Sequence, residues 1–349
     1  MNNKKKLAAL QSRTWVMDSA TLGELGDILE GGGPVDAETV AQRLGIRIRS
    51  GDAVAVGSLA VIPIVGVIEY RPSWLSDFGV TVPTLRVSAA IRAALEDPQI
   101  STIVLDIDSP GGTVDGVMEL AAEIRKAREV KPIIAIANPR AASAAYWIAA
   151  QATEIVITPS GDVGSIGVYL MHVEQSARIE KEGYKITFVS AGKHKVEANP
   201  YQPLSEEAQA DLQANVNAIY DVFVSDVAKG RKVTKSKVLK QFGEGRMLLA
   251  KDALAAGMVD RIASADEVFQ KLHRSKTRGR RSEEMSVREF EEALRDGESF
   301  SNAESKRIAS LVYGGEVTET PPRDEGEDLK ALAVSLEDLL RSIPRASNE

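Results

Sequence analysis

The sequence predicts an α/β fold with a mostly parallel sheet, and two observations lead to this expectation. Short apolar runs rich in β-branched residues alternate with amphipathic stretches from about residue 53 to residue 229, which is the pattern of repeated βα units. The chain has 349 residues, 44% of them hydrophobic, which is enough to bury a sizeable core. We therefore expect one large α/β domain with an extension at each end.

The elements of this domain follow one another along the chain. Strands are predicted at Val61–Ile68, Thr102–Ile107, Ile133–Ala137, Ile155–Ile157 and Lys185–Val189. Helices are predicted at Leu85–Leu95, Val114–Arg128, Ala142–Ala150, Val173–Glu182, Glu206–Lys229, Lys251–Ala256 and Asp266–His273. The longest helix carries its apolar residues on one face, and Ser205 is its expected N-cap.

The two ends of the chain differ in character from the domain. Residues 1–50 are expected to form a helical N-terminal lead-in, with helices around Leu22–Leu29 and Ala37–Leu44. The domain itself is expected to span residues 51–273, followed by a basic linker at 274–282. The tail, residues 283–349, holds 8 Lys/Arg against 17 Asp/Glu, so we expect an acidic, partly disordered and partly helical extension or a scaffold or docking segment.

Composition excludes several classes of protein. Because cysteine is absent, no disulfide framework, thiol nucleophile or Cys-rich metal site can form. The three histidines are His172, His194 and His273, and their spacing predicts no metal site; we expect no cofactor. The net charge of −7 gives no reason to expect nucleic-acid binding. The basic N-terminus lacks the apolar segment of a signal peptide, and no run reaches transmembrane length, so we expect a soluble cytoplasmic protein without membrane contact.

A glycine-rich turn directly follows the strand predicted at Thr102–Ile107. It reads Asp108-Ser109-Pro110-Gly111-Gly112, and paired glycines leave backbone N–H groups uncovered by side chains. Such groups can stabilise a developing oxyanion. On its own, the same turn is equally typical of an ordinary βα connection.

Two further segments supply a nucleophile and a base. Ser143 lies at the start of a predicted helix among small residues, where the helix dipole favours an alkoxide-like charge, although an ordinary N-cap serine looks the same. Gly192-Lys193-His194-Lys195 follows the strand predicted at Lys185–Val189 and offers three bases, of which a lysine must be buried to be neutral. A turn, a nucleophile and a base in this order fit a covalent hydrolase, and the glycines within Gly161–Gly167 are expected to shape the site floor or a subunit contact.

At these residues the chain resembles the S49 peptidase family, the signal peptide peptidase A group, whose fold is ClpP/crotonase-like with repeated ββα units. The resemblance runs from about residue 59 to residue 272. It rests on five ordered motifs: Asp108–Gly112, Ala142–Tyr146, Asp162–Val168, Lys195, and the stretch from Gly245 to Asp260. One departure is that Ala144 and Ala145 replace the usual glycine pair after the nucleophile.

The resemblance implies a Ser–Lys serine peptidase. Ser143 is then the nucleophile and Lys195 the general base, with Lys193 and His194 as rival bases. The backbone N–H groups of Gly112 and Ala144 form the oxyanion hole, and Gly111 and His194 support the site. The resemblance also implies a ring-like homo-oligomer in which neighbouring subunits supply parts of each site.

The chain shows no membrane anchor and has an acidic tail. In both respects it resembles the phage branch of the family, the prohead or capsid-assembly proteases. That branch implies capsid and scaffold proteins as substrates, and a location in the host cytoplasm or the phage prohead. Three alternatives stay open: a cytoplasmic peptidase that degrades signal peptides or proteins, a crotonase-like acyl-CoA enzyme, and a catalytically inactive assembly scaffold. The acyl-CoA enzyme would need an acidic residue in the cleft in place of the Ser–Lys pair.

Overall fold

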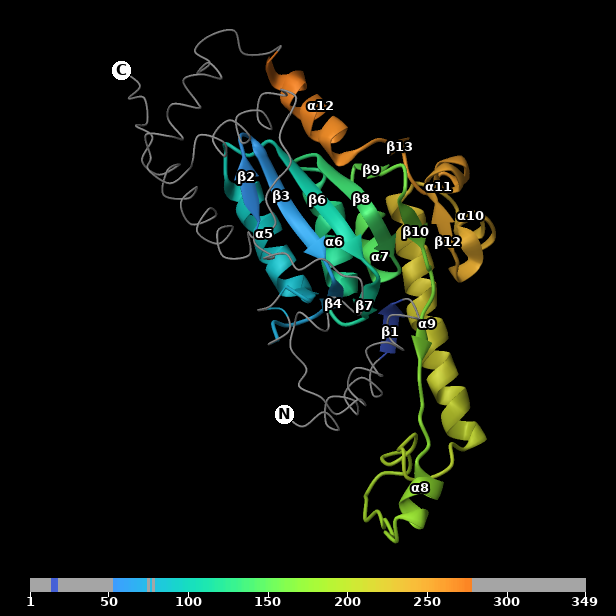
Figure 1. Ribbon diagram of the computed structural model, residues 1–349. Helices are drawn as coiled ribbons and strands as arrows, with labels where there is room; N and C mark the ends of the chain where they lie inside the picture. Colours follow the sequence, from blue (N-terminus) through green and yellow to red (C-terminus); the bar gives the residue numbers. More distant parts are fainter. Residues whose placement is uncertain (1–13, 18–52, 74–75, 77–78, 278–349) are drawn as a thin grey trace, which may run out of the picture. The chain divides into compact units, whose positions relative to one another are not determined.

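The computed structural model of the chain describes residues 14–17, 53–73, 76 and 79–277 (Figure 1). The tail expected at 283–349 and the two helices expected before residue 50 lie outside this part, and so does most of the linker expected at 274–282. Within the expected helical lead-in, the described segment β1 (Thr14–Met17) is a strand rather than a helix. Among the described helices, none combines the length and the apolar character needed to cross a lipid bilayer.

The larger sheet is mostly parallel, which confirms the predicted fold class. Its strands run in the order β12-β10-β8-β6-β3-β2, and β9 and β13 extend it beside β8. Every pairing among β3, β6, β8, β9, β10 and β13 is parallel, whereas the edge strands β2 and β12 pair antiparallel. Their bounds are Val54–Val56 (β2), Leu59–Val65 (β3), Thr102–Ser109 (β6), Ile133–Ala142 (β8), Glu154–Ile157 (β9), Asp162–Gly164 (β10), Met247–Leu249 (β12) and Arg261–Ile262 (β13).

Helices pack against one face of this sheet. Figure 1 shows α5 (Thr84–Glu96), α6 (Val117–Ala127) and α7 (Ala144–Ala149) side by side behind the strands, and α9 (Glu206–Gly230) contacts both α6 and α7. On α6 the buried residues recur at helical spacing, Val117, Leu120, Ala121, Ile124 and Ala127. Burying each of the larger aliphatic side chains stabilises the fold by roughly 1.5–3 kcal/mol, so this amphipathic stripe fixes α6 on the sheet.

A second, smaller sheet lies at the carboxyl end of β3 and β6. Its strand order is β11-β1-β7-β4-β5, with β4 at Val67–Glu69, β5 at Thr81–Pro83, β7 at Gly111–Thr113 and β11 at Tyr169–Leu170. β4 pairs in parallel with β5 and β7, whereas β1 pairs antiparallel with β7 and β11. The strand predicted at Val61–Ile68 is thus two strands in different sheets, separated at Gly66, whose φ is +88°.

Three sequence expectations need correction here. The segment Lys185–Val189, predicted as a strand, has no regular structure, and Val189 is 98% exposed. A strand-like sequence needs a neighbouring strand to pair with, and the described chain offers none to this segment. The helix predicted at Val173–Glu182 shortens to α8 (Ser176–Lys181). The glycine turn does not lead straight into a helix at Val114, since β7 intervenes and α6 begins at Val117.

The remaining helices complete the described chain. α10 (Lys235–Gln241), which the sequence did not predict, follows α9, and α11 (Ala250–Ala256) matches the prediction of Lys251–Ala256. The predicted N-cap of α9 is confirmed, because Ser205 Oγ accepts a 3.2 Å hydrogen bond from the Ala208 N–H. The unit that comprises these elements ends at Ser264, and α12 (Ala265–Thr277) opens a second unit.

Candidate active site

Ser143 lies at the junction between the end of β8 and the start of α7. Its backbone has φ 55° and ψ −115°, a conformation that costs a non-glycine residue about 1–3 kcal/mol. The residue is fully buried, and its Oγ has no hydrogen-bond partner among the described residues. A buried, unpartnered hydroxyl on a strained backbone is a costly arrangement, and such strain is typical of functional positions.

The backbone around Ser143 leaves the first N–H group of α7 outside the helical ladder. The first hydrogen bond of the helix runs from the Trp147 N–H to the Ser143 carbonyl at 2.9 Å, and the Ser143 N–H itself donates to the Gly164 carbonyl at 2.7 Å. The N–H of Ala144 therefore has no partner within the helix. Ala144 and Ala145 are both fully buried, so the alanines that replace the expected glycines are accommodated without exposure.

The predicted oxyanion turn comes to the same edge of the fold. Ser109 on β6 is in register with Ala141 on β8, so the segments that follow these two strands emerge side by side. Helix α7 lies against β7, the strand that carries Gly111 and Gly112. The side chain of Ser109 stabilises the turn, because its Oγ donates to the Gly66 carbonyl at 2.7 Å and accepts from the Gly111 N–H at 3.2 Å.

Gly112 is required by the close approach of β4. A Cβ atom at this position would lie 1.8 Å from the Ile68 carbonyl oxygen, which is backbone and cannot move aside cheaply. Backbone packing alone therefore requires a glycine at position 112, whether or not its N–H takes part in catalysis. The structure brings Gly111, Gly112, Ser143 and Ala144 together, as the sequence predicted.

The helix that carries Ser143 is held from behind by buried contacts. Trp147 stacks on Phe223 of α9 with 4.3 Å between ring centroids, and its Nε1 donates to Asp226 at 3.2 Å. Tyr146 donates from its hydroxyl to the Met258 carbonyl at 2.9 Å, and burial raises the pKa of this hydroxyl, so it stays neutral. Both aromatic residues pack in the core, since each is fully buried.

The candidate bases lie elsewhere, on the segment between β11 and α9, residues 171–205, which we call the arm. Lys193, His194 and Lys195 are all exposed. Lys193 forms a 2.9 Å ion pair with Glu207, which raises the pKa of the lysine, and His194 Nδ1 lies 2.6 Å from Glu197. In Figure 1 the arm extends past the N-terminal end of α9, away from the sheets.

Helix α9 separates the arm from α7. Its N-terminal end contacts Lys193 through Glu207, and Phe223, which stacks on Trp147, lies about 24 Å further along the helix axis. The extended side chain of a lysine is much shorter than this separation. Within one chain, the structure therefore does not bring Lys195, Lys193 or His194 to Ser143.

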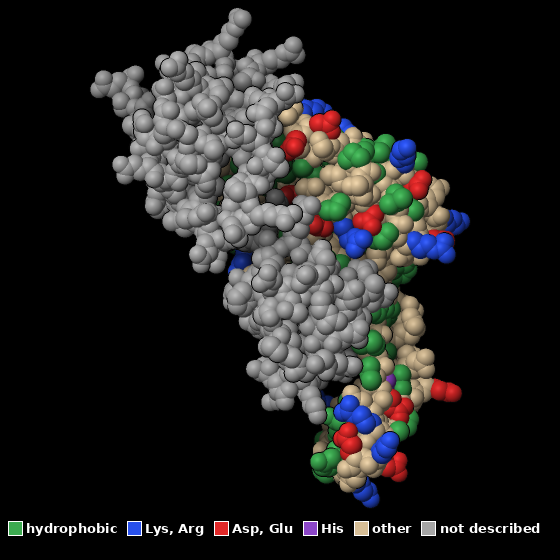
Figure 2. Space-filling model, in the orientation of Figure 1, with side chains coloured by type: hydrophobic (Ala, Val, Ile, Leu, Met, Phe, Trp, Pro, Cys, Tyr) green, Lys and Arg blue, Asp and Glu red, His purple; other side chains and the backbone are tan. Residues whose placement is uncertain are grey.

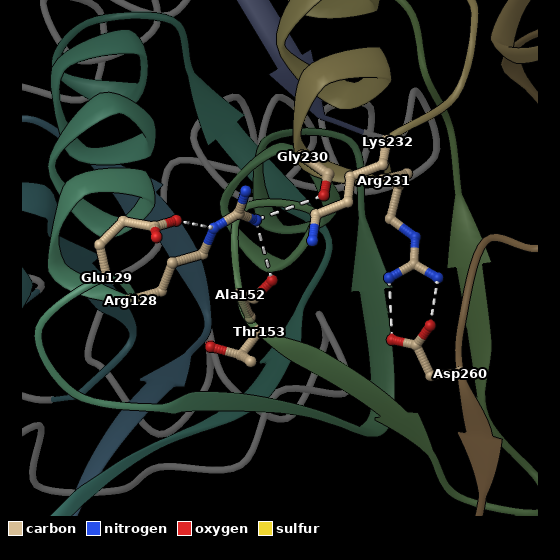
Figure 3. Close-up of a pocket in the computed structure, with 8 residues that line it drawn as sticks. All are labelled: Arg128, Glu129, Ala152, Thr153, Gly230, Arg231, Lys232 and Asp260. Carbon is tan, nitrogen blue, oxygen red and sulfur yellow. Dashed lines mark hydrogen bonds and ion pairs between the residues drawn. The ribbon is translucent and has the colours of Figure 1, made fainter.

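Two other features could hold a ligand. His194, Glu197 and Glu207 place ligand atoms within 4.8 Å of one another, but Glu207 already pairs with Lys193 and Glu197 with His194. A cavity of about 360 Å³ is lined by the residues labelled in Figure 3. Its arginines are also satisfied, because Arg128 donates to the Gly230 carbonyl and Arg231 forms a two-bond pair with Asp260. None of the predicted site residues lines it.

Comparison with known proteins finds a family model that matches part of the chain. The model of Peptidase family S49 matches residues 125–278, a segment that includes both Ser143 and Lys195.

The chain is similar to two phage proteins. It is 28% identical over 276 residues to capsid assembly protease C of Escherichia phage lambda, which covers 79% of this chain and 60% of that protein. It is 29% identical over 214 residues to head-tail preconnector protein GP5 of Enterobacteria phage P21, which covers 61% of this chain and 42% of that protein. The chain thus spans less than two thirds of the length of both relatives.

The chain is also similar to a solved structure, that of a mutant of a membrane-bound stomatin-specific protease in complex with a substrate peptide. The identity is 16% and the TM-score 0.40, with 62% of this chain and 81% of that chain covered.

Sequence reasoning missed two parts of this site. The Gly164 carbonyl, which accepts from Ser143, belongs to a glycine-rich stretch that was expected to shape the site floor, but no residue pattern singled out its partner. The pairing of β1 with β7 brings residues 14–17 beside Gly112, and a four-residue strand so far away in the chain leaves no periodic signal.

Proposed function

We propose that the chain is a serine endopeptidase in which Ser143 is the nucleophile and Lys195 of a neighbouring copy is the general base. The observation that carries the proposal is the strained, fully buried Ser143, whose Oγ has no partner among the described residues. A crotonase-like acyl-CoA enzyme has no use for such a hydroxyl. The match of residues 125–278 to the model of Peptidase family S49 supports the same activity.

The proposed chemistry is acyl transfer in two steps. The neutral amine of Lys195 takes the proton of Ser143 Oγ while that oxygen attacks the substrate's peptide carbonyl, and the N–H groups of Gly112 and Ala144 donate to the oxyanion. The tetrahedral intermediate then collapses, the C–N bond breaks, and the leaving amine takes the proton from Lys195. Water attacks the acyl-enzyme with Lys195 again as base, which releases the new carboxyl terminus and restores Ser143.

Supply of the lysine by a neighbour follows from the geometry of one chain. The arm that carries Lys195 is separated from Ser143 by several turns of α9, and in its own chain the lysine is exposed to water. The arm also exposes apolar side chains, shown among charged ones in Figure 2, including Tyr184, Ile186, Val189 and Tyr201. Docking this surface on another copy would bury both the apolar residues and the amine.

For the natural substrates we propose the capsid and scaffold proteins of a phage head. The proposal rests on the similarity to the capsid assembly protease of phage lambda and to the head-tail preconnector protein of phage P21. On this view the chain acts as a ring-like homo-oligomer, as the sequence resemblance implies. The Ser143 hydroxyl, which has no partner among the described residues, supports this function over that of an inactive scaffold.

Mixing two inactive variants tests the proposed dyad and its division between subunits. Ser143→Ala and Lys195→Ala should each abolish cleavage of casein and of the chain itself, while size-exclusion chromatography shows the same oligomer as the wild type. In a co-refolded equal mixture, about a quarter of the sites combine an intact serine with an intact lysine from the neighbour, so about a quarter of wild-type activity should return.

Several outcomes would contradict this scheme. Cleavage retained by either variant alone rules out the dyad, and two oligomeric variants that do not complement each other rule out the division between subunits. Lys193→Ala and His194→Ala serve as matched controls in the same loop and should keep most activity, because each native side chain is occupied by a carboxylate. Activity lost in His194→Ala but kept in Lys195→Ala would make the histidine the base.

A further inference from the structure

Strand β1 is inserted between two strands that come from much later in the chain. Its residues pair antiparallel with β7, Val16 opposite Gly112 and Met17 opposite Gly111, and on the other side with β11, Trp15 opposite Tyr169. β7 and β11 make no ladder pairing with each other in the smaller sheet. Adjacent strands lie about 4.8 Å apart, so β7 and β11 flank a gap of roughly 10 Å that one extended segment fills.

The gap has the properties of a groove for an extended peptide. Both of its walls are strands, so they present rows of backbone N–H and C=O groups to whatever lies between them, and main-chain hydrogen bonds hold any extended sequence. In the described part of the chain, β11 pairs with no strand except β1. When β1 leaves, β11 becomes an edge strand with unpaired N–H and C=O groups, which another extended segment can pair with.

The groove runs across the candidate active site. One wall, β7, carries Gly112, the proposed oxyanion donor, and lies against α7. The other wall, β11, follows the segment whose Gly164 carbonyl accepts the Ser143 N–H. Val16 lies directly opposite Gly112, so the backbone of β1 passes the position where the carbonyl of a substrate must sit.

We infer that residues 14–17 act as an internal competitor, which occupies the substrate groove between β7 and β11 and must leave before a peptide substrate binds. The inference rests on the proposed function for the identity of the groove. Because β1 is tethered to the site, its effective concentration is of the millimolar order typical of intramolecular partners. If β1 is docked in about nine molecules of ten, the apparent KM is about tenfold higher than without it, while kcat is unchanged.

Proline substitutions in the full chain test this competition through the backbone alone. In a strand with neighbours on both sides, successive N–H groups point to opposite neighbours, so Trp15→Pro and Val16→Pro each remove a donor to a different wall. Val16→Ala is the matched control, because it keeps the N–H group. We expect KM for a peptide substrate to fall roughly three- to tenfold in either proline variant, with kcat unchanged and the alanine control close to wild type.

Hydrogen exchange measures the displacement of β1 independently of enzyme activity. Amides of Gly111–Thr113 and Tyr169–Leu170 should exchange faster in the proline variants than in the wild type and the control. A fluorescent peptide with the sequence of residues 12–19 should bind the proline variants more tightly than the wild type, and it should inhibit them. This binding should also appear in Ser143→Ala, where no cleavage can interfere.

The two proposals can fail separately. Unchanged exchange in both proline variants overturns the inference, whatever the enzyme activity is. Faster exchange with an unchanged KM in an active enzyme also overturns it, because β1 would then not compete with substrate. Faster exchange and tighter peptide binding in a protein that cleaves nothing uphold the groove and its internal occupant, and overturn the proposed peptidase function instead.

Discussion

The backbone N–H of Ser143 donates a 2.7 Å hydrogen bond to the carbonyl oxygen of Gly164. This bond ties the candidate nucleophile to β10 and uses the one backbone donor that Ser143 itself could offer to an oxyanion. The N–H of Ala144, which has no partner within the helix, and that of Gly112 are the proposed oxyanion donors. The position of Gly164 therefore controls the backbone of the serine without contacting a substrate.

Replacement of Gly164 by alanine should distort the site. Gly164 has φ +138°, and an added Cβ would lie 2.4 Å from the Arg246 carbonyl oxygen, so we expect a loss of more than about 2 kcal/mol in the free energy of unfolding. Peptidase activity should fall through kcat. Gly167→Ala is the control, because no heavy atom lies within 4 Å of its added Cβ, and it should change stability by less than about 0.5 kcal/mol. Urea titration of both variants is the measurement, and equal stabilities would contradict the argument.

Two inactive variants at position 143 should differ in stability. Neither Ser143→Gly nor Ser143→Ala loses a side-chain hydrogen bond, because Oγ has no partner among the described residues. Glycine also relieves the backbone strain at φ 55° and ψ −115°, whereas alanine does not. We expect the glycine variant to be more stable than the alanine variant by roughly 1 kcal/mol, measured by chemical denaturation. A more stable alanine variant would mean that the conformation is not strained.

Asp226 should matter far more to stability than another aspartate on the same helix. Asp226 is buried, accepts from Trp147 Nε1 and lies 3.4 Å from Arg125, so Asp226→Ala should cost about 3 kcal/mol and loosen α7. Asp221 pairs with Lys235 on the surface, and Asp221→Ala should cost less than about 1 kcal/mol. Thermal unfolding of the two variants gives the comparison. Similar midpoints would show that the buried network contributes little.

The pair of Arg231 and Asp260 should contribute to stability in a pH-dependent way. Burial alone would raise the pKa of Asp260, but hydrogen bonds from Arg231 and from the Ile155 N–H outweigh it and lower the pKa below its usual 3.8. A lowered pKa in the folded state stabilises the fold above the unfolded pKa, and this stabilisation is lost as pH falls through the folded pKa. The stability difference between wild type and Asp260→Asn should therefore be full at pH 7 and shrink below about pH 4.

Urea midpoints at a series of pH values measure this difference, and Asp252→Asn, at an exposed position on α11, serves as the control. A difference that stays constant across the acid range would exclude the carboxylate as its source.

The central βα units were predictable because their signals are local. The strand β8 begins with the apolar run Ile133–Ala137, and helices such as Val117–Ala127 show helical periodicity, so each could be located from its own residues. The short strands β1, β7 and β11 could not be found this way, because they exist only through partners distant in the chain. The opposite error occurred at Lys185–Val189, where strand-like alternation meets no partner strand.

The candidate site also has a part that local sequence patterns could predict and a part that they could not. Ser143, Ala144 and Gly112 come together because the strands that precede them are neighbours in one sheet, and parallel strands end at a common edge. Lys195 follows no paired strand, so its position depends on the direction of the arm, which no local pattern encodes. Spacing along the sequence predicted a set of candidate site residues, but it could not predict that α9 would hold the serine and the lysine of one chain apart.

The length of α9 has a consequence for how activity depends on protein concentration. On the proposed mechanism a solitary chain holds two half-sites and no complete one, so specific activity rises with protein concentration and vanishes on dilution. Newly made chains are then inert until enough copies accumulate in one place. A helix that acts as a spacer thus couples hydrolysis to local crowding, and proteolysis begins only where the enzyme has been gathered.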